Sequence, residues 1–285
     1  MKLTCVTAVF NAVKSGNCDN LIRCIESVAA LATEHEHLIY DGASTDGTVE
    51  LLKELENKIP ALKVVSEKDT GIYNALNKGV RDAKGDWFYV LGCDDYISNP
   101  SVLDQLLTQM SDDVDEIVAP VEREDGQRPF FRKIKDLSVI FRTVPYSHQG
   151  MILRTRHVRR FGGFDESYKI CADWDMMNKV HHATLNIEYT FRPFAFYASG
   201  GLSDNSHQGW LEVRSIIEKH LNLTDEEAHQ FREIGFPPLN KMLPYLFGKD
   251  LAYRLGAREM VWRNLKFHFL RFLSIMYRPI KRLFS

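Results

Sequence analysis

Residues 89–96, Tyr-Val-Leu-Gly-Cys-Asp-Asp-Tyr, join an apolar run to two adjacent carboxylates. The apolar run predicts a strand, and Asp94 and Asp95 follow at its carboxyl end. Ligands of an open α/β sheet bind outside the carboxyl ends of its strands, so a charged ligand is expected beside these residues. Carboxylate oxygens suit Mg²⁺ or Mn²⁺, which usually keep positions open for substrate phosphates. Asp is also common in turns, and these two residues alone support a metal site and a plain turn equally.

Strands and helices alternate along residues 3–110, the part of the chain that contains this stretch. The apolar patterns predict strands at 3–10, 37–40, 62–65 and 87–91, and helices near 21–29, 49–55, 72–83 and 100–110. Such alternation indicates a mainly parallel sheet with crossover helices on its faces. We therefore predict the α/β fold class, with a Rossmann-like central sheet.

Polar clusters follow four of the predicted strands. They lie at Thr7 to Asn11, Asp41 to Thr48, Glu67 to Gly71, and Asp94 with Asp95. The loops at the carboxyl ends of parallel strands open on one edge of the sheet, although each cluster taken singly could be a turn or a helix cap. Neither a Gly-Lys-Ser/Thr phosphate loop nor a Gly-x-Gly-x-x-Gly motif follows the first strand, so we expect carboxylates and a metal ion to hold a nucleotide.

The alternation weakens after about residue 110. The patterns predict strands at 116–121, 151–153, 187–191 and 194–197, a turn at 122–126, a helix at 173–183, and helical structure from about 208. Residues 127–150 lack clean periodicity but carry basic side chains together with His148 and Gln149, which favours a segment facing an acceptor. We divide the chain into a catalytic domain at 1–205, with halves at about 1–110 and 111–205, and a helical, basic region at 206–285.

Length and composition limit the class of protein. The chain has 285 residues, enough for one large domain or two, and a net charge of -2, so we expect no nucleic acid partner. Its five cysteines are an odd number without paired metal-ligand spacing, which predicts reduced thiols and a cytoplasmic location. The chain enters a strand pattern at once, so we expect no signal peptide, and no apolar run is long enough to span a bilayer.

Taken together, these motifs resemble the family 2 glycosyltransferases of the GT-A fold. The resemblance covers roughly residues 1–205 and is carried by Thr7 to Asn11, Asp-Gly-Ala-Ser-Thr-Asp-Gly-Thr at 41–48, Glu-Lys-Asp-Thr-Gly-Ile-Tyr-Asn-Ala-Leu-Asn-Lys-Gly at 67–79, Gly85-Asp86 and Leu-Gly-Cys-Asp-Asp at 91–95. Further motifs resemble the acceptor half of bacterial polysaccharide and O-antigen members. They are Gly-Gly-Phe-Asp-Glu at 162–166, Tyr-Lys-Ile-Cys-Ala-Asp-Trp-Asp at 168–175 and Gly-Gly-Leu-Ser at 200–203.

The resemblance implies an inverting hexosyltransferase that moves a sugar from a nucleotide diphosphate donor, by default a UDP-sugar, to a glycan acceptor in bacterial surface polysaccharide synthesis. It also implies roles for individual residues: Asp41 contacts the nucleoside, Thr7, Phe10 and Asn11 line its pocket, Asp69 and Asp94 contact nucleoside or donor sugar, and Asp95 binds Mn²⁺ or Mg²⁺. That metal would act as a Lewis acid on the departing diphosphate.

Two positions depart from the family pattern. Cys93 stands where the Asp-x-Asp motif has its first carboxylate, which leaves the number of metal ligands open. Ala172 precedes Asp173 where a Glu-Asp dyad is often found on the acceptor side.

Inversion in a single displacement needs one general base, and we predict Asp173. The alternative role of Asp173 is to interact with the dipole of the helix that it opens. Asp175 is the second candidate for the base, but two residues along a helix its side chain would point elsewhere. We place His148, Gln149 and Trp174 on the acceptor side. His148 suits a metal or phosphate ligand and a structural hydrogen bond equally.

Two other classes of protein remain open from the sequence. A metal-dependent nucleotidyltransferase also joins a nucleotide-binding sheet to metal-bound carboxylates, but residues 12–16, Ala-Val-Lys-Ser-Gly, match its glycine-rich basic loop poorly. A non-catalytic sugar-nucleotide-binding protein remains open because of Cys93.

Residues 260–285 are basic and apolar without an acidic residue. The cations are Arg263, Lys266, Arg271, Arg278, Lys281 and Arg282. This pattern predicts an amphipathic helix lying on an anionic membrane, and with it a peripheral position at the inner face of the cell membrane and an acceptor carried on a lipid diphosphate. The alternatives are a helix packed on the catalytic domain and an oligomer contact, and Pro279 would end or kink the helix in each case.

Overall fold

A computed structural model describes residues 1–125, 128–132, 146–183, 185–198, 207–234, 237–238 and 241 of the chain. Residues 1–220 form one compact unit, and residues 221–285 form another. The site discussed below lies in the first unit.

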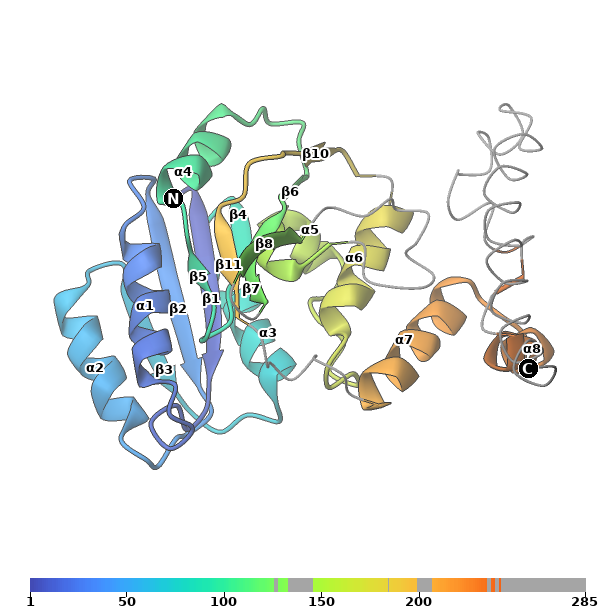
Figure 1. The fold of residues 1–285 in the computed structure, drawn as a ribbon, viewed down its shortest axis with the longest axis horizontal. Helices are drawn as coiled ribbons and strands as arrows, with labels where there is room; N and C mark the ends of the chain where they lie inside the picture. The colour runs from blue at the N-terminus through green and yellow to red at the C-terminus, as the bar shows by residue number, and fades with distance from the viewer. Residues whose placement is uncertain are drawn as a thin grey trace, which may run out of the picture. The chain divides into compact units, whose positions relative to one another are not determined.

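The first unit is built on a seven-stranded sheet with strand order β10-β6-β9-β4-β1-β2-β3. Its strands are β1 (Leu3–Val9), β2 (His35–Asp41), β3 (Leu62–Ser66), β4 (Trp87–Val90), β6 (Glu116–Val118), β9 (Met151–Arg154) and β10 (Ile187–Tyr189). All neighbours are parallel except β9, which runs antiparallel to both β4 and β6. The predicted α/β fold with a mainly parallel central sheet is confirmed (Figure 1).

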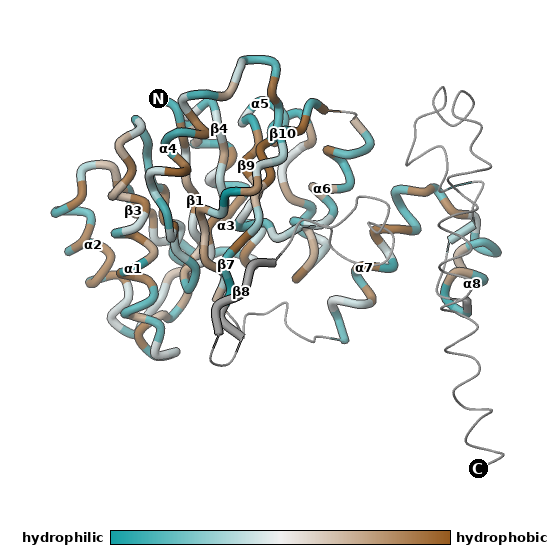
Figure 2. The backbone as a smooth tube through the Cα atoms, turned by 45° about the horizontal axis from the view of Figure 1, so that its top comes forward, coloured by the Kyte–Doolittle hydropathy of each residue, from teal (hydrophilic) through white to brown (hydrophobic). Residues whose placement is uncertain are grey.

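Helices cover this sheet, and two more follow it along the chain (Figure 1). They are α1 (Cys18–Ala29), α2 (Thr48–Lys58), α3 (Ile72–Asp82), α4 (Pro100–Gln109), α5 (Thr155–Arg160), α6 (Ala172–His182), α7 (His207–His220) and, in the second unit, α8 (Asp225–Ile234). Hydrophobic and hydrophilic residues alternate along α1 and α2 (Figure 2), as expected for helices with one buried face.

The core follows the alternation of side chains along β1. Leu3 and Cys5 point to one face, in a buried cluster with residues of β4, α1 and α4. Val6 points to the other face, against α3. A Cβ at Gly79 of α3 would lie 2.5 Å from Cγ1 of Val6, so glycine at this position lets α3 pack directly on β1.

A second, four-stranded sheet has the order β5-β11-β7-β8. Its strands are β5 (Tyr96–Ile97), β11 (Ala195–Tyr197), β7 (Val121–Asp125) and β8 (Arg128–Arg132). Strands β7 and β8 correct two sequence-based expectations, because residues 122–125 were expected in a turn and 128–132 without regular structure. Strands β7 and β8 pair with each other, and β7 also pairs with β11, which is a contact with a distant segment that local periodicity does not report.

The carboxyl-terminal part of the chain is described in part. Helices α7 and α8 agree with the predicted helical extension. The predicted basic helix at 260–285 lies outside the described residues. Among the helices that the structure describes, none combines the length and the apolar character needed to cross a membrane.

Candidate active site

The loops that follow β1 and β2 are joined to each other by hydrogen bonds of polar side chains. The backbone N–H of Asn11 donates to Oγ of Ser44 over 2.7 Å, and Oδ1 of Asn11 accepts from the backbone N–H of Thr45 over 3.2 Å. Asn11 has a φ of 48°, in the left-handed region that Asn adopts more readily than most residues. This residue therefore joins two of the loops that were predicted to form the nucleotide site.

Asp41 ends β2 and is almost completely buried. Its carboxylate accepts hydrogen bonds from the backbone N–H and the hydroxyl of Ser44, and from the Ser66 hydroxyl over 2.6 Å. A carboxylate offers about four acceptor positions, of which two are used by Ser44 in the loop after β2 and one by Ser66 at the end of β3. A nucleoside contact by Asp41 would use the remaining position.

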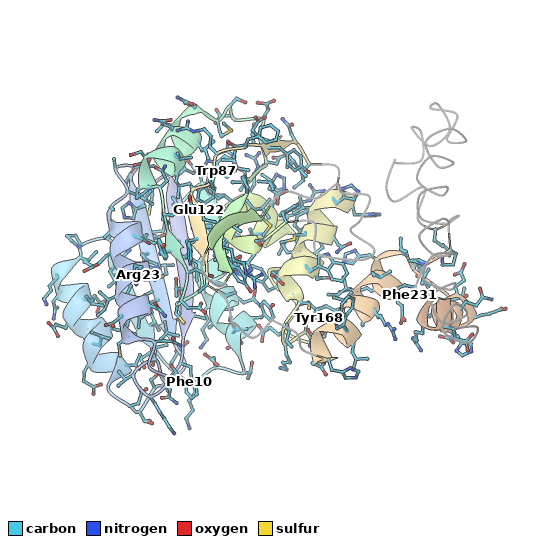
Figure 3. All side chains as sticks on the ribbon, viewed as in Figure 1. Phe10, Arg23, Trp87, Glu122, Tyr168 and Phe231 are labelled. Atoms are coloured by element: carbon cyan, nitrogen blue, oxygen red, sulfur yellow. The ribbon has the colours of Figure 1, made fainter. Side chains whose placement is uncertain are left out.

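Phe10, Gly42 and Asp69 meet where the loops after β1, β2 and β3 converge. A Cβ at Gly42 would lie 2.9 Å from Oδ2 of Asp69 and 3.1 Å from the ring of Phe10. The Phe10 side chain is 66% exposed and lies at the opposite end of the sheet from Trp87 (Figure 3). An exposed aromatic face beside a carboxylate can stack on a flat heterocycle and accept its hydrogen bonds.

Thr7 does not reach this group of side chains. It is fully buried, and its Oγ1 lies 3.0 Å from Nε2 of His37 and 3.8 Å from Sγ of Cys24. Its side chain belongs to the interior of the domain, on the same face of β1 as Leu3 and Cys5.

Asp94 and Asp95 follow β4 and turn their carboxylates toward the same glycine. A Cβ at Gly92 would lie 2.5 Å from Oδ2 of Asp95 and 2.9 Å from Oδ1 of Asp94. Asp95 is only 3% exposed, and its two oxygens accept from Nε2 of Gln149 and the backbone N–H of Ala198, each over 2.8 Å. Burial raises the pKa of Asp95 to about 6, against the opposing charge of His148 and these hydrogen bonds.

The small sheet explains how Ala198 reaches Asp95. Strand β5 begins directly after Asp95, and β11 ends directly before Ala198. Because Tyr96 pairs with Phe196 across these two strands, the backbone N–H of Ala198 comes to lie beside the carboxylate of Asp95.

Cys93, the position that departs from the family pattern, packs against the apolar cluster formed by α1, α2 and the ends of β1, β2 and β3. Burial, reinforced by the neighbouring aspartates, raises the pKa of its thiol to about 12. An unpaired carboxylate among these apolar side chains would be costly to bury, whereas a neutral thiol is not.

The donor set after β4 fits a hard divalent cation. Within the described part of the chain, no group of three or more His, Cys, Asp or Glu side chains is arranged to hold a metal ion. Mg²⁺ and similar ions commonly use one or two protein carboxylates and take their remaining ligands from water and substrate phosphates. The two oxygens that converge at Gly92 meet this requirement.

His148 and Asp173 face each other on the acceptor side. His148 opens the short 3-10 helix η2 (His148–Gly150), and its Nδ1 lies 3.1 Å from Oδ2 of Asp173. Burial opposes protonation, but the hydrogen bond to Asp173 and the charges of Asp173, Asp95 and Asp94 together raise the pKa of His148 above its ordinary value. Because Nδ1 is engaged, a metal would have to be bound through Nε2.

Asp173 lies in the first turn of α6 and is partly accessible, with 24% of its side chain exposed. Its Oδ1 accepts from the backbone N–H of Trp174 over 2.8 Å and lies 3.5 Å from the Tyr73 hydroxyl. The bond to its own helix matches the dipole role considered above, and the contact with His148 adds a second role.

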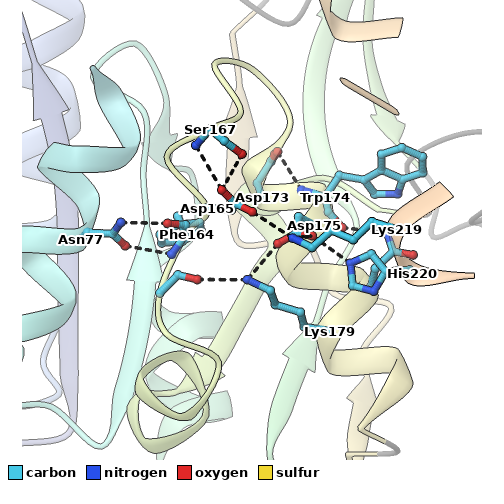
Figure 4. A network of polar contacts seen from close by, with 12 residues as sticks. Asn77, Phe164, Asp165, Ser167, Asp173, Trp174, Asp175, Lys179, Lys219 and His220 are labelled. Atoms are coloured by element: carbon cyan, nitrogen blue, oxygen red, sulfur yellow. Dashed lines mark hydrogen bonds and ion pairs between the residues drawn. The ribbon is translucent and has the colours of Figure 1, made fainter. Parts of the chain in front are cut away.

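The remaining acceptor-side residues lie inside the domain. Gln149 bonds Asp95, and its backbone oxygen accepts from the Tyr89 hydroxyl over 2.8 Å. Trp174 is fully buried. Asp175 is also fully buried and is paired with Lys179, Lys219 and His220 (Figure 4), so it does not compete with Asp173 for an accessible proton.

Sequence reasoning missed Ser66, Tyr73 and Ala198. Tyr73 lies within the quoted run at 67–79, which was the one available signal for it. The Ala198 contact comes through the backbone, so no residue type could have indicated it.

Solved structures share this fold. The structure of S. aureus TarS residues 1–349 in complex with UDP-GlcNAc matches with a TM-score of 0.64 and 19% identity, over 87% of this chain and 71% of that one. The mannosyltransferase PcManGT from Pyrobaculum calidifontis, in complex with GDP-Man and Mn²⁺, matches with a TM-score of 0.57 and 15% identity, over 99% of this chain and 82% of that one. These matches, together with the sheet described above, confirm the GT-A fold.

The sequence comparisons show the family. The family model for Glycosyl transferase family 2 matches residues 4–174. An uncharacterized glycosyltransferase of Mycobacterium tuberculosis is 29% identical over 171 residues, which cover 56% of this chain and 63% of that protein. The chain belongs to glycosyl transferase family 2, as the sequence motifs predicted.

Proposed function

We propose that this protein is an inverting glycosyltransferase that moves a hexose from a nucleotide diphosphate donor to a glycan acceptor. The observation that carries this proposal is the arrangement at the end of β4, where Asp94 and Asp95 converge. Their charges help to raise the pKa of His148, and His148 contacts Asp173. One carboxylate pair suits a metal diphosphate, and a separate, partly accessible carboxylate suits an acceptor hydroxyl. Family membership favours glycosyl transfer over the nucleotidyltransferase alternative.

Asp173 acts as the general base in this proposal. It takes the proton of the acceptor hydroxyl while the acceptor oxygen forms a bond to the anomeric carbon of the sugar and the bond from that carbon to the diphosphate breaks. Nδ1 of His148 lies 3.1 Å from the carboxylate, and this hydrogen bond with the charges of Asp173, Asp95 and Asp94 raises the pKa of His148 against the effect of burial.

Asp95, assisted by Asp94, would hold a divalent cation such as Mn²⁺ or Mg²⁺, which as a Lewis acid stabilises the charge of the departing diphosphate. The nucleoside lies at the edge formed by Phe10, Asn11 and Asp69, with Asp41 beneath it. We propose UDP as the nucleotide, as in the TarS complex. The catalytic domain extends over about residues 1–205.

The acceptor proposed here is a growing bacterial surface glycan carried on a lipid diphosphate. The enzyme would then work in the cytoplasm, at the inner face of the cell membrane, through the basic residues at 260–285. Co-sedimentation with anionic liposomes tests this contact. We expect the full chain to bind, and the same chain with Lys266, Arg271 and Arg278 changed to Glu to remain in solution; equal binding of both would refute the contact.

The reaction is tested by a screen of nucleotide-sugar donors that measures released nucleoside diphosphate, with and without glycan acceptors and with Mn²⁺ or EDTA. We expect one nucleotide to dominate, release to increase when the acceptor is present, and EDTA to suppress both. Binding of donors without release under any condition would indicate a sugar-nucleotide-binding protein instead.

A further inference from the structure

The loop that leads into α6 is held by one carboxylate of α7. Glu212 is 5% exposed, and its Oε1 accepts from the backbone N–H of Lys169 over 2.9 Å. Its Oε2 accepts from the backbone N–H groups of Ile170 and Cys171 over 2.9 and 3.0 Å. Three consecutive N–H groups, which end at the residue before α6, thus converge on one side chain.

The same peptide segment is held from its other side by α3. The hydroxyl of Tyr73 donates to the backbone oxygen of Ile170 over 2.6 Å, and this hydroxyl also lies 3.5 Å from Oδ1 of Asp173. Ile170 therefore has its N–H bonded to α7 and its C=O bonded to α3. The orientation of this peptide sets where the first turn of α6, and Asp173 with it, begins.

Helix α7 makes a second, separate set of contacts with α6 at Asp175. Lys219 and His220 approach Oδ1 of Asp175 at 3.6 and 2.8 Å, as Figure 4 shows. Lys219 reaches Asp165 as well, over 2.9 Å. These ion pairs join α7 to Asp165 and Asp175 but reach neither residues 169–171 nor Asp173.

Glu212 has the chemistry for such a role. No side chain caps α6 in the usual way, and a negative charge near a helix amino terminus interacts favourably with the helix dipole. Burial opposes ionisation, but the hydrogen bonds from the three N–H groups and from Nε2 of Gln208 lower the pKa of Glu212, so it is a carboxylate at neutral pH. An apolar side chain would be enough to pack α7 against the domain. The directional hydrogen bonds of Glu212 to three peptide groups also specify where residues 169–171 lie.

We propose that Glu212 is a positioning residue for transfer, which acts by fixing the 169–171 loop and thereby the place of Asp173 relative to His148 and the acceptor. The inference rests on the proposed role of Asp173 as the base. It also gives Glu212, on a helix beyond residue 205 and beyond the part of the chain that the family model matches, a role in supporting the site.

A graded pair of substitutions tests this role. Glu212→Gln keeps one acceptor oxygen but turns an amide donor toward an N–H group, and Glu212→Ala removes every bond. Displacement of a catalytic group by about 1 Å can cost roughly 100-fold, so we expect kcat to fall by about 3- to 10-fold in the first variant and by about 10- to 100-fold in the second. The KM for the donor should stay within about 2-fold in both.

Lys219→Met is the matched control. It removes ion pairs from the same helix and the same interface but touches none of residues 169–171. We expect a lower melting temperature with kcat within about 2-fold of the unchanged chain. If Lys219→Met and Glu212→Gln lower kcat equally at equal loss of melting temperature, Glu212 is only a structural contact and the proposal is overturned.

A double-mutant cycle separates this inference from the proposed function. If Glu212 acts through Asp173, adding Glu212→Ala to Asp173→Asn should leave the residual kcat within about 2-fold, because the group to be positioned is already inactive. A further 10-fold loss would show an effect that does not pass through Asp173 and would overturn the proposal. Full turnover of Asp173→Asn alone would instead refute the base, and with it the proposed mechanism.

Discussion

The two sides of the proposed site are assembled in different ways. On the donor side, Phe10, Asp41, Asp69 and Asp94 follow consecutive parallel strands that are neighbours in the sheet. On the acceptor side, Asp173 is surrounded by His148 of η2, Tyr73 of α3 and its own helix. The donor side therefore follows from the order of strands, and the acceptor side depends on contacts between segments far apart in the chain. Changes remote from the site should affect the acceptor side more.

Asp95 belongs to both sides, because it follows β4 but is held by Gln149 and Ala198. We expect Asp95→Ala to abolish transfer and to remove the response to Mn²⁺, the largest effect of any single change. Initial rates across a manganese titration measure this, with Asp19→Ala on the exposed part of α1 as the control. Full activity of the unchanged enzyme in EDTA would contradict the metal role.

Asp173→Asn tests the acceptor side alone. We expect turnover to fall by about 10² to 10⁴, the usual effect of losing a positioned general base, while donor affinity stays nearly unchanged. Single-turnover rates and calorimetric titration with the donor measure the two quantities separately. Weaker donor binding with normal turnover would mean that Asp173 belongs to the donor side.

Asp41→Ala tests the donor side. Hydrogen bonds to a charged group contribute about 1.5–3 kcal/mol, so loss of the nucleoside contact should weaken nucleotide binding by roughly 10- to 100-fold with little change in turnover. Ser66→Ala is the control, since it removes one bond to Asp41 but no proposed nucleoside contact. Equal loss of affinity in both variants would show that Asp41 only ties β2 to β3.

Glu116 tests how far the buried part of the acceptor half depends on pH. Burial raises the pKa of this side chain from 4.5 to about 8, against the hydrogen bond from Tyr146. Between these values the folded state binds more protons than the unfolded state, so the free energy of unfolding falls as pH rises. Urea titrations at pH 5 and pH 8 measure how much unfolding free energy is lost as the pH rises. We expect this loss to be smaller for Glu116→Gln than for the unchanged chain, by on the order of a few kcal/mol. Parallel losses in the two proteins would contradict the buried, protonated state.

Cys93→Ala should have the smallest effect. The thiol packs against apolar side chains and offers no oxygen ligand, so transfer and the manganese response should stay within about 2-fold. Kinetics at several manganese concentrations measure this. A large loss of metal response would place Cys93 among the ligands after all.

The periods of strands and helices could have predicted the directions of two side chains near the site. Thr7 shares the face of β1 that carries Leu3 and Cys5, and alternate residues of a strand point the same way, so its buried position was predictable. Trp174 adjoins Asp173 on a helix, where successive side chains point in different directions, so only one of the two could face an acceptor. The motifs identified both residues, but the periodicity decided which way they point.

The sequence by itself determined the sheet, its covering helices, the loops that meet at its carboxyl edge and the family, because burial of apolar area imposes a local period that can be read along the chain. The second sheet, the hold of Gln149 and Ala198 on Asp95, and the pairing of His148 with Asp173 were decided only by the tertiary structure. The contacts of Asp95 and of His148 join residues that are 25 to more than 100 positions apart, through single hydrogen bonds and backbone groups. Such contacts leave no periodic trace in the chain, since any segment carrying a donor could meet the same acceptor until the packed elements bring one of them into place.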